Sequence, residues 1–310
     1  MRIVYMGTPD FAVLPLEKLV AAGHQVVAVI TQPDRPRQRG KQYTPTPVKA
    51  RSLELGLPVY TPEKVNAPEV LSLLSSLKPE LFVVVAYGQF LSEKLFTLPP
   101  YGAVNIHASL LPAYRGAAPI HWAVLHGESR TGVTIMYIDK GMDSGDMLLQ
   151  QETEIGPEED TGSLHDRLSQ IGADLLLEAI KQIQSGTAVR IPQDHIAATL
   201  APMLKKEQER VDWSQSAQTI HDQIRGLHPW PGCYSIWQGK RLKLHASRVL
   251  DQTSQAHPGQ ILAAGTPGIT VACGQGCLLL TQVQPEGKAP MEAGAFVRGY
   301  HPKAGQMLGE

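Results

Sequence analysis

Cysteine is scarce in this sequence: the chain of 310 residues has three, at Cys233, Cys273 and Cys277. An odd number cannot pair completely within one chain, and Cys-x-x-x-Cys without a nearby histidine is a poor match to zinc sites. Disulfides and a structural zinc are therefore poor explanations of the fold. We expect reduced thiols packed inside a cytosolic protein, and no metal ion.

The sequence also lacks an excess of charge of one sign and a long hydrophobic run. Its formal net charge is −1, which argues against nucleic-acid binding over the whole surface but leaves room for a local basic patch. No run approaches the ~20 apolar residues of a membrane span. The chain opens on a strand-like segment, residues 1–7, with no secretory leader before it. We expect a cytoplasmic enzyme of a cell without organelle import, and no membrane partner.

Common nucleotide-binding motifs are missing as well. Gly7-Thr8-Pro9-Asp10 follows the first apolar run, where a phosphate-binding loop could stand. However, neither Gly-x-Gly-x-x-Gly nor Gly-x-x-x-x-Gly-Lys-Ser/Thr occurs. Dinucleotide and P-loop chemistry are discounted on that ground, and Asp10 is expected to cap the following helix.

Apolar runs alternate with helical patterns from residue 1 to about residue 185. Such alternation is typical of an α/β protein with a Rossmann-like parallel sheet that is covered on both faces. Ligands of these sheets bind at the carboxyl ends of the strands. The expected strands are Ile3–Met6, Val26–Ile30, Leu81–Ala86, Val104–Ile106 and Val133–Ile138, and the expected helices are Phe11–Ala22, Pro68–Leu77, Pro119–Leu125 and Ser163–Gln184.

The rest of the chain has a different pattern, and its length suggests two domains of ~100–200 residues each. A Pro-containing stretch without periodicity is followed by a short helix, Ser216–Arg225, and by five short strands, which suggest a small OB-like β-barrel. These strands are Cys233–Trp237, Leu242–Val249, Gly259–Ala264, Gly268–Ala272 and Cys277–Val283. We predict a catalytic domain at residues 1–188, a linker at 189–206 and the OB-like domain at 207–310.

The most informative motif lies at the end of the strand Val104–Ile106. Asn105 and His107 stand two residues apart, so both side chains should project from the same side of the strand. An amide donor beside an imidazole can polarise a carbonyl group and handle a proton near neutral pH. The alternative for an isolated Asn-x-His is a solvated loop with an ordinary histidine.

An acidic loop, Asp139-Lys140-Gly141-Met142-Asp143-Ser144-Gly145-Asp146, follows the strand Val133–Ile138. A calcium site is one interpretation, but the EF-hand pattern and its later glutamate are missing. The better interpretation pairs one aspartate with His107, because a carboxylate fixes the imidazole tautomer and favours its protonated form. A solvated acidic turn is the remaining alternative.

Two groups of basic residues stand out in an otherwise balanced sequence. The first follows the strand Val26–Ile30 in a Pro-rich loop, and the second lies in the predicted barrel. Basic loops at the rim of a site suit phosphate contacts, and two patches on separate domains fit an extended anion, although charged loops are often only solvated. The residues are Arg35, Arg37, Arg39 and Lys41 in the loop, and Lys240, Arg241 and Lys243 in the barrel.

Taken together, these motifs resemble those of the methionyl-tRNA formyltransferases, which belong to the 10-formyltetrahydrofolate-dependent formyltransferases. The resemblance covers nearly the whole chain. It rests on Gly7–Ala12, Gln32–Arg35, Arg39-Gly40-Lys41, Pro47-Val48-Lys49, Val83–Gly88, Asn105-x-His107, Ser109–Gly116, Gly132–Met136, Asp143–Asp146, Asp212-Trp213-Ser214 and Pro229-Trp230-Pro231-Gly232. The core motifs are shared with other formyltransferases, whereas the basic loop and the last two motifs discriminate better.

The resemblance implies transfer of a formyl group from 10-formyltetrahydrofolate, a co-substrate, to the α-amine of methionyl-initiator tRNA, which supports translation initiation. It assigns catalysis to Asn105, His107 and Asp143. We expect the folate in a strand-end cleft formed by Tyr87, Gly88, Gln89, Ser109, Leu110, Leu111, Pro112 and Asp139. The two basic groups are expected to bind tRNA, and the protein is expected to be a monomer. Alternatives are a sugar-nucleotide or glycinamide formyltransferase, and an inert tRNA-binding protein.

Overall fold

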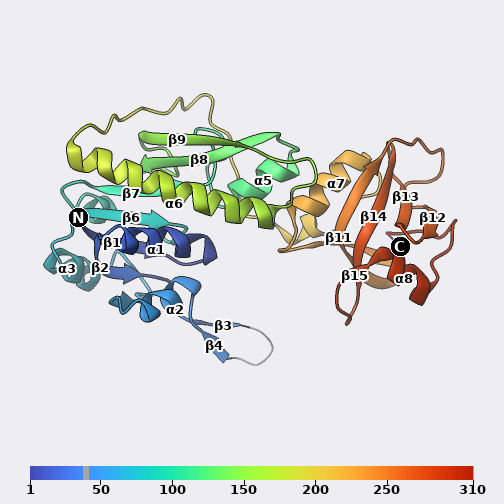
Figure 1. Cartoon of the computed structure of the whole chain (residues 1–310), viewed down its shortest axis with the longest axis horizontal. Coiled ribbons are helices and arrows are strands. Elements are labelled where there is room, and N and C mark those ends of the chain that lie inside the picture. Colours follow the sequence, from blue (N-terminus) through green and yellow to red (C-terminus); the bar gives the residue numbers. More distant parts are fainter. Residues whose placement is uncertain (38–41, 310) are drawn as a thin grey trace. The chain divides into compact units, whose positions relative to one another are not determined.

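The computed structural model describes residues 1–37 and 42–309. It divides into two compact units (Figure 1). Unit 1 contains Met1–Gly116, Thr131–Thr153 and His165–Ala201, and unit 2 contains Ala117–Arg130, Glu154–Leu164 and Pro202–Glu310. No helix within the described ranges is both long and apolar enough to cross a membrane.

Unit 1 is built on a seven-stranded sheet in the order β5-β2-β1-β6-β7-β8-β9. The pairs from β5 through β7 are parallel, whereas β8 runs antiparallel to β7. Short Val- and Ile-rich runs suit such strands because both faces of the sheet are covered. The strands are β1 (Arg2–Gly7), β2 (Gln25–Ile30), β5 (Val59–Tyr60), β6 (Leu81–Val85), β7 (Ala103–His107), β8 (Arg130–Tyr137) and β9 (Met147–Glu154).

Helices cover both faces of this sheet. On one face lie α1 (Val13–Ala21) and α6 (Thr161–Ser185), joined by an ion pair between Lys18 and Asp174 (Figure 1). On the other face, Val70 and Leu74 of α3 (Pro68–Ser76) and Leu95 of α4 (Glu93–Phe96) pack against the sheet. The remaining elements are a 3-10 turn at Asp10–Ala12, α2 (Pro47–Glu54), and a separate hairpin of β3 (Arg35–Arg37) and β4 (Gln42–Thr44).

Unit 2 is built on an all-antiparallel sheet in the order β10-β11-β14-β13-β12, with β15 paired to β14. Alternate residues of β10, namely Cys233, Ser235 and Trp237, are buried, as period-two strands with one face in a core require. The elements are α5 (Pro119–Leu125), a 3-10 turn at Lys206–Glu209, α7 (Ala217–Gly226), β10 (Cys233–Trp237), β11 (Lys240–Leu250), β12 (Ile261–Gly265), β13 (Gly268–Ala272), β14 (Cys277–Pro285), β15 (Met291–Glu292) and α8 (Ala293–Tyr300).

The predicted fold class is confirmed: a parallel-dominated α/β sheet is followed by a separate antiparallel, barrel-like sheet. Two details differ from expectation. The strand at Val133–Ile138 was expected in a parallel sheet, but β8 is antiparallel to its neighbour. Asp10 lies inside the 3-10 turn and makes no side-chain cap, because Pro9 occupies the N-cap position.

The domain division at residues 188 and 206 stays a prediction. In the structure, residues 189–201 of the expected linker are part of unit 1. Backbone hydrogen bonds fix part of this segment: Ile191 N–H donates to the Met147 carbonyl at 2.9 Å, and Arg115 N–H donates to the Thr199 carbonyl at 2.9 Å. The segment therefore packs against the end of the sheet that carries the candidate site.

Candidate active site

Strand β7 directs Asn105 and His107 to one face of the sheet of unit 1. Ile106, between them, faces α6: a Cβ atom on Gly172 would lie 2.8 Å from its Cγ2. Because side chains alternate along a strand, Asn105 and His107 project from the opposite face. The structure therefore places the two side chains on one side, as the sequence predicts.

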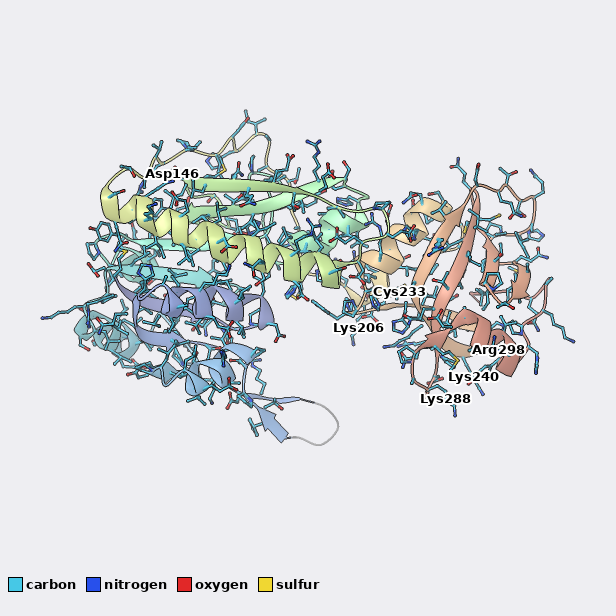
Figure 2. The ribbon with its side chains drawn as sticks, in the orientation of Figure 1. Asp146, Lys206, Cys233, Lys240, Lys288 and Arg298 are labelled. Atoms are coloured by element: carbon cyan, nitrogen blue, oxygen red, sulfur yellow. The ribbon has the colours of Figure 1, made fainter. Side chains whose placement is uncertain are left out.

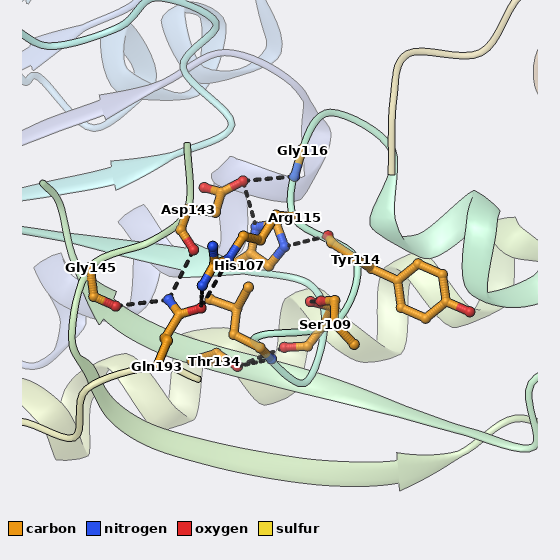
Figure 3. Close-up of polar contacts among 11 residues, drawn as sticks. His107, Ser109, Tyr114, Arg115, Gly116, Thr134, Asp143, Gly145 and Gln193 are labelled. Carbon is orange, nitrogen blue, oxygen red and sulfur yellow. Dashed lines mark hydrogen bonds and ion pairs between the residues drawn. The ribbon is translucent and has the colours of Figure 1, made fainter. Parts of the chain in front are cut away.

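His107 is held by contacts at both ring nitrogens (Figure 3). Its Nε2 lies 2.9 Å from the Tyr114 carbonyl, and its Nδ1 lies 3.6 Å from Oδ2 of Asp143. A carbonyl oxygen only accepts, so Nε2 carries a proton and Nδ1 faces the carboxylate. A proton at Nδ1 would therefore find an anionic partner. The ring is 5% exposed, which limits competition from water.

Asp143 has one oxygen engaged and one available. Its Oδ2 accepts a hydrogen bond of 2.9 Å from the Gly116 N–H and faces His107. Its Oδ1 has no hydrogen bond to any residue that the structure describes, and the side chain is 21% exposed. Oδ1 is therefore the atom of this pair that an entering molecule can reach.

The route by which Asp143 reaches His107 differs from the one expected. Because β8 is antiparallel to β7, Tyr137 near its carboxyl end pairs with Val104, whereas His107 pairs with Thr134. The loop after β8 must therefore turn back along the strand. Its backbone is tight: Asp143 has a φ of 50°, and a Cβ atom at Gly145 would lie 2.0 Å from the Tyr137 carbonyl.

Asn105 is the third polar side chain beside His107 and Asp143. It is half-buried, and its side-chain amide has no hydrogen-bond partner among residues 1–37 and 42–309. A free amide donor near a shielded imidazole and a carboxylate suits a reaction in which negative charge develops on oxygen while a proton leaves nitrogen. A nucleophilic serine or cysteine is not needed for such a reaction.

The residues expected to bind folate lie in three loops, after β6, β7 and β8. The expected common strand end is not found for Asp139, because β8 is antiparallel and Ile138 N–H donates to the Ala103 carbonyl at the amino end of β7. Tyr87 follows β6; its hydroxyl is buried without a partner in the described part of the chain, and burial raises its pKa to about 12. Gly88 has a φ of 91°. The Gln89 side chain is occupied: its Oε1 accepts from the Val65 N–H at 2.9 Å. Asp139 is also occupied, because it accepts hydrogen bonds from Gly141 N–H and the Ser144 hydroxyl.

The remaining predicted folate residues form the loop Ser109–Pro112 after β7. Ser109 is fully buried, and its hydroxyl donates to the Ala113 carbonyl at 2.6 Å. Leu111 packs with Met136 and Met147. The side chains of Ser109 and Leu111 therefore hold the loop, and the Leu110 and Pro112 carbonyls accept from Ala113 N–H and Thr199 N–H. Only the side chains of Leu110 and Pro112 are left as groups that could meet a ligand.

Sequence reasoning missed the residues that support this loop. Thr134 of β8 accepts from the Leu111 N–H at 3.1 Å and donates to the Ser109 carbonyl at 2.7 Å. Gln150 of β9 donates to the Leu111 carbonyl at 2.8 Å. Polar residues facing inward from apolar strands were the available signal. Arg115 and Gln193, which support the Asp143 loop, were also missed, because Gln193 stands in a stretch that looks like a linker.

The structure describes some of the predicted basic residues. Arg35 is exposed in β3, whereas Arg39, Lys41 and the side chain of Arg37 lie outside the described residues. Lys240, Arg241 and Lys243 are exposed on β11, with Lys240 at its start (Figure 2). The Arg241 guanidinium stacks 4.0 Å above the Tyr234 ring.

Neither a metal site nor a reactive thiol is found within the described part of the chain. No group of three or more His, Cys, Asp or Glu side chains there could hold a metal ion. The three cysteines are free and buried. Burial raises the pKa of the Cys273 thiol to about 12 and that of Cys233 still further, which disfavours the nucleophilic thiolate.

Comparisons with known proteins identify the family of this chain. The family described as "Formyl transferase" matches residues 1–180, and "Formyl transferase, C-terminal domain" matches residues 203–301. Methionyl-tRNA formyltransferases from Moorella thermoacetica and Citrifermentans bemidjiense are 51% and 49% identical over 100% of this chain and over 99% and 97% of their own lengths.

Solved structures share the fold at low identity. One is an N-formyltransferase from Helicobacter canadensis in complex with folinic acid and dTDP-3-aminofucose, with a TM-score of 0.68, 18% identity and coverage of 92% of this chain and 99% of that one. HypX from Aquifex aeolicus in complex with tetrahydrofolic acid has a TM-score of 0.64 and 18% identity over 96% of this chain and 48% of its own. From the two matched regions and the full-length identity, the chain belongs to the formyl transferase family.

Proposed function

We propose that the protein transfers the formyl group of 10-formyltetrahydrofolate to the α-amine of methionyl-initiator tRNA, and so serves translation initiation. The observation that carries the proposal is the free Oδ1 of Asp143 beside the shielded His107, on the same side of β7 as the free Asn105 amide. The full-length identity to methionyl-tRNA formyltransferases supports this acceptor.

The residues present fit a folate donor at the end of the sheet. The buried Tyr87 hydroxyl has no partner in the described ranges, so a bound molecule or an ordered water would satisfy it. Leu110 and Pro112 offer apolar contact, whereas the carbonyls of residues 109–112 are already bonded within the chain and hold the loop in place. When bound, the donor supplies an activated formyl group; the chain supplies position, hydrogen bonds and a proton acceptor.

In the proposed reaction the amine nitrogen forms a bond to the formyl carbon, and the carbonyl electrons move to oxygen. The Asn105 amide donates a hydrogen bond to that oxyanion. Asp143 Oδ1 takes one proton from the attacking nitrogen and returns it to the leaving nitrogen as the second carbon–nitrogen bond breaks. Gly116 N–H holds the other carboxylate oxygen, Oδ2, which also faces His107 Nδ1; a proton on Nδ1 would stabilise the carboxylate there.

The acceptor is proposed to contact the basic loop at residues 35–41 and, more weakly, Lys240, Arg241 and Lys243. Residues 207–310 are proposed as the tRNA-binding domain of a monomer. A cytoplasmic location follows from the proposed substrate, because charged initiator tRNA is used there. These assignments rest on the chemistry of phosphate recognition and on the family resemblance.

A comparison of acceptors tests this function. The purified protein is incubated with 10-formyltetrahydrofolate and, separately, with methionyl-initiator tRNA, uncharged initiator tRNA and a dTDP-amino sugar. Transfer to the charged tRNA alone supports the proposal. Transfer to the amino sugar in preference to tRNA would replace it with sugar-nucleotide formylation, and tRNA binding without transfer would indicate an inert binding protein.

Asn105→Ala should lower the turnover number by about 10²–10³-fold, because a donor aimed at a developing oxyanion acts mainly in the transition state. The apparent Michaelis constants of both substrates should change little. Steady-state kinetics at saturating donor checks this expectation. Thr97→Ala, which removes an exposed side chain of the same unit, is the control and should keep its activity. Near-normal turnover in folded Asn105→Ala would remove Asn105 from the proposed mechanism.

Arg39→Ala should raise the apparent Michaelis constant for methionyl-tRNA and leave that for the folate donor almost unchanged. Each lost phosphate contact should also flatten the salt dependence of tRNA binding by about 0.7–0.9 units of log–log slope. Arg51→Ala is a matched control, because this guanidinium already pairs with Glu17 and Glu54. Equal shifts of both Michaelis constants in Arg39→Ala would instead indicate that the loop covers the folate.

A further inference from the structure

Gln193 makes a set of hydrogen bonds that the proposed reaction does not yet use. Its side-chain N–H donates to the Asp143 carbonyl at 2.9 Å and to the Gly145 carbonyl at 2.8 Å. Its Oε1 accepts from Arg115 at 3.1 Å and 2.6 Å. Gln193 is 5% exposed and Arg115 is 8% exposed, so water competes little for these bonds (Figure 3).

Arg115 stands between the two residues whose backbones touch the catalytic pair. The Tyr114 carbonyl bonds to His107, and the Gly116 N–H bonds to Asp143. The contacts therefore close a ring: His107 to the segment 114–116, that segment to Asp143, and Asp143 through Gln193 back to Arg115. The ring determines where the Asp143 carboxylate lies relative to the imidazole.

The ring is anchored by the same extended segment that carries Gln193. Arg115 N–H donates to the Thr199 carbonyl at 2.9 Å, and Ala201 N–H donates to the Arg115 carbonyl at 2.7 Å. A Cβ atom at Gly116 would lie 2.7 Å from the Ala201 carbonyl. Residues 114–116 and the segment 193–201 thus lie in close contact, so a shift of one segment would also move the other.

The Asp143 backbone needs such support. A φ of 50° at a residue with a side chain is sparsely populated, and it persists where the surroundings over-determine it. The Gln193 amide bonds the carbonyls on both sides of Ser144, and so holds the turn at the residue that carries the carboxylate. Without these two bonds the turn could relax and move the carboxylate away from His107.

We propose that Gln193 is a positioning residue that acts through Asp143: with Arg115, it holds the Asp143 carboxylate in place for proton transfer. The inference rests on the proposed function. Gln193 reaches no substrate in this account, because all its polar atoms bond to the chain. Its loss should therefore lower turnover and leave substrate binding nearly unchanged.

The test is the steady-state kinetics of Gln193→Glu. This variant keeps an oxygen that accepts from Arg115, but it replaces the N–H that donates to the Asp143 and Gly145 carbonyls with a carboxylate oxygen, which repels them. We expect the turnover number to fall by about 10²-fold, the loss typical of a misplaced reacting group, with both Michaelis constants within about two-fold. Gln151→Glu is the matched control, because Gln151 is exposed on the same sheet. Unchanged turnover, or a rise in a Michaelis constant alone, would overturn the proposal.

A double-variant cycle separates positioning of Asp143 from a general effect on the fold. In an Asp143→Ala background the added Gln193→Glu should cause no further loss, because the group that it positions is gone. Multiplied losses would overturn the proposal. If Gln193→Glu does not fold, Gln193→Met takes its place, because methionine has a similar length and makes no hydrogen bonds. The expected result is the same. If the unchanged protein transfers no formyl group to charged tRNA, the proposed function fails; if it does and Gln193→Glu stays fully active, only this inference fails.

Discussion

Replacing Asp143 by asparagine should lower the turnover number for formyl transfer by about 10²–10⁴-fold, the range for loss of a general acid–base group. Asparagine keeps an oxygen for the Gly116 N–H, so the loop should hold, but it loses the anion that faces His107 at 3.6 Å. His107→Ala should cost a similar factor. Donor affinity should survive in both variants, because neither side chain is assigned to the pterin.

The measurement is single-turnover transfer with saturating donor, together with donor binding by titration. Asp194→Asn is the matched control, because it makes the same change at an exposed aspartate of the same unit, and it should be fully active. Near-normal turnover in folded Asp143→Asn would contradict the assignment of proton transfer to this residue. A parallel loss of donor binding would assign Asp143 to the folate site instead.

Asp222→Ala should destabilise unit 2 by about 3–5 kcal/mol, the usual cost of leaving one member of a buried ion pair unpaired. The Asp222 and Arg225 side chains are 6% and 7% exposed, and Nη2 of Arg225 lies 2.7 Å from Asp222. The Arg225 guanidinium also donates to the Glu159 carbonyl at 2.9 Å. Removing the carboxylate leaves the positive charge of Arg225 without its anionic partner, in a site that water scarcely reaches.

Tryptophan fluorescence during urea unfolding reports this change, because Trp122, Trp213, Trp230 and Trp237 all belong to unit 2. The double variant Asp222→Ala/Arg225→Met should recover much of the loss, since it leaves no buried charge. Asp251→Ala, which removes an exposed aspartate of the same unit, should leave the midpoint close to that of the unchanged protein. An unaltered midpoint in Asp222→Ala would show that the pair contributes nothing to unit 2.

The sequence predicts the strands of the first sheet well where apolar β-branched residues run together. Ile3–Met6 and Val26–Ile30 fall within β1 and β2, and Pro119–Leu125 matches α5. The antiparallel direction of β8 could not be predicted, because a strand buried on both faces has the same pattern in either direction. Two strands have too weak a pattern to recognise. β5 has only two residues, and the C-terminal half of β9 is largely polar.

The candidate site is predictable in part for the same physical reasons. Alternation along a strand is a local property, so the shared side of Asn105 and His107 follows from their spacing. The contact between His107 and Asp143 was expected, but the returning loop that makes it depends on tertiary structure. Gln193 illustrates the limit: a glutamine between Pro192 and Asp194 reads as a linker residue, and only the folded chain brings it to the Asp143 carbonyl.

The most direct measurement for the whole account is transfer of a labelled formyl group from 10-formyltetrahydrofolate to methionyl-initiator tRNA, followed by mild hydrolysis of the ester and identification of the released amino acid. The account predicts labelled N-formylmethionine from the unchanged protein and almost none from Asp143→Asn at equal concentration. Unlabelled methionine from the unchanged protein, or equal labelling by the two proteins, would contradict it.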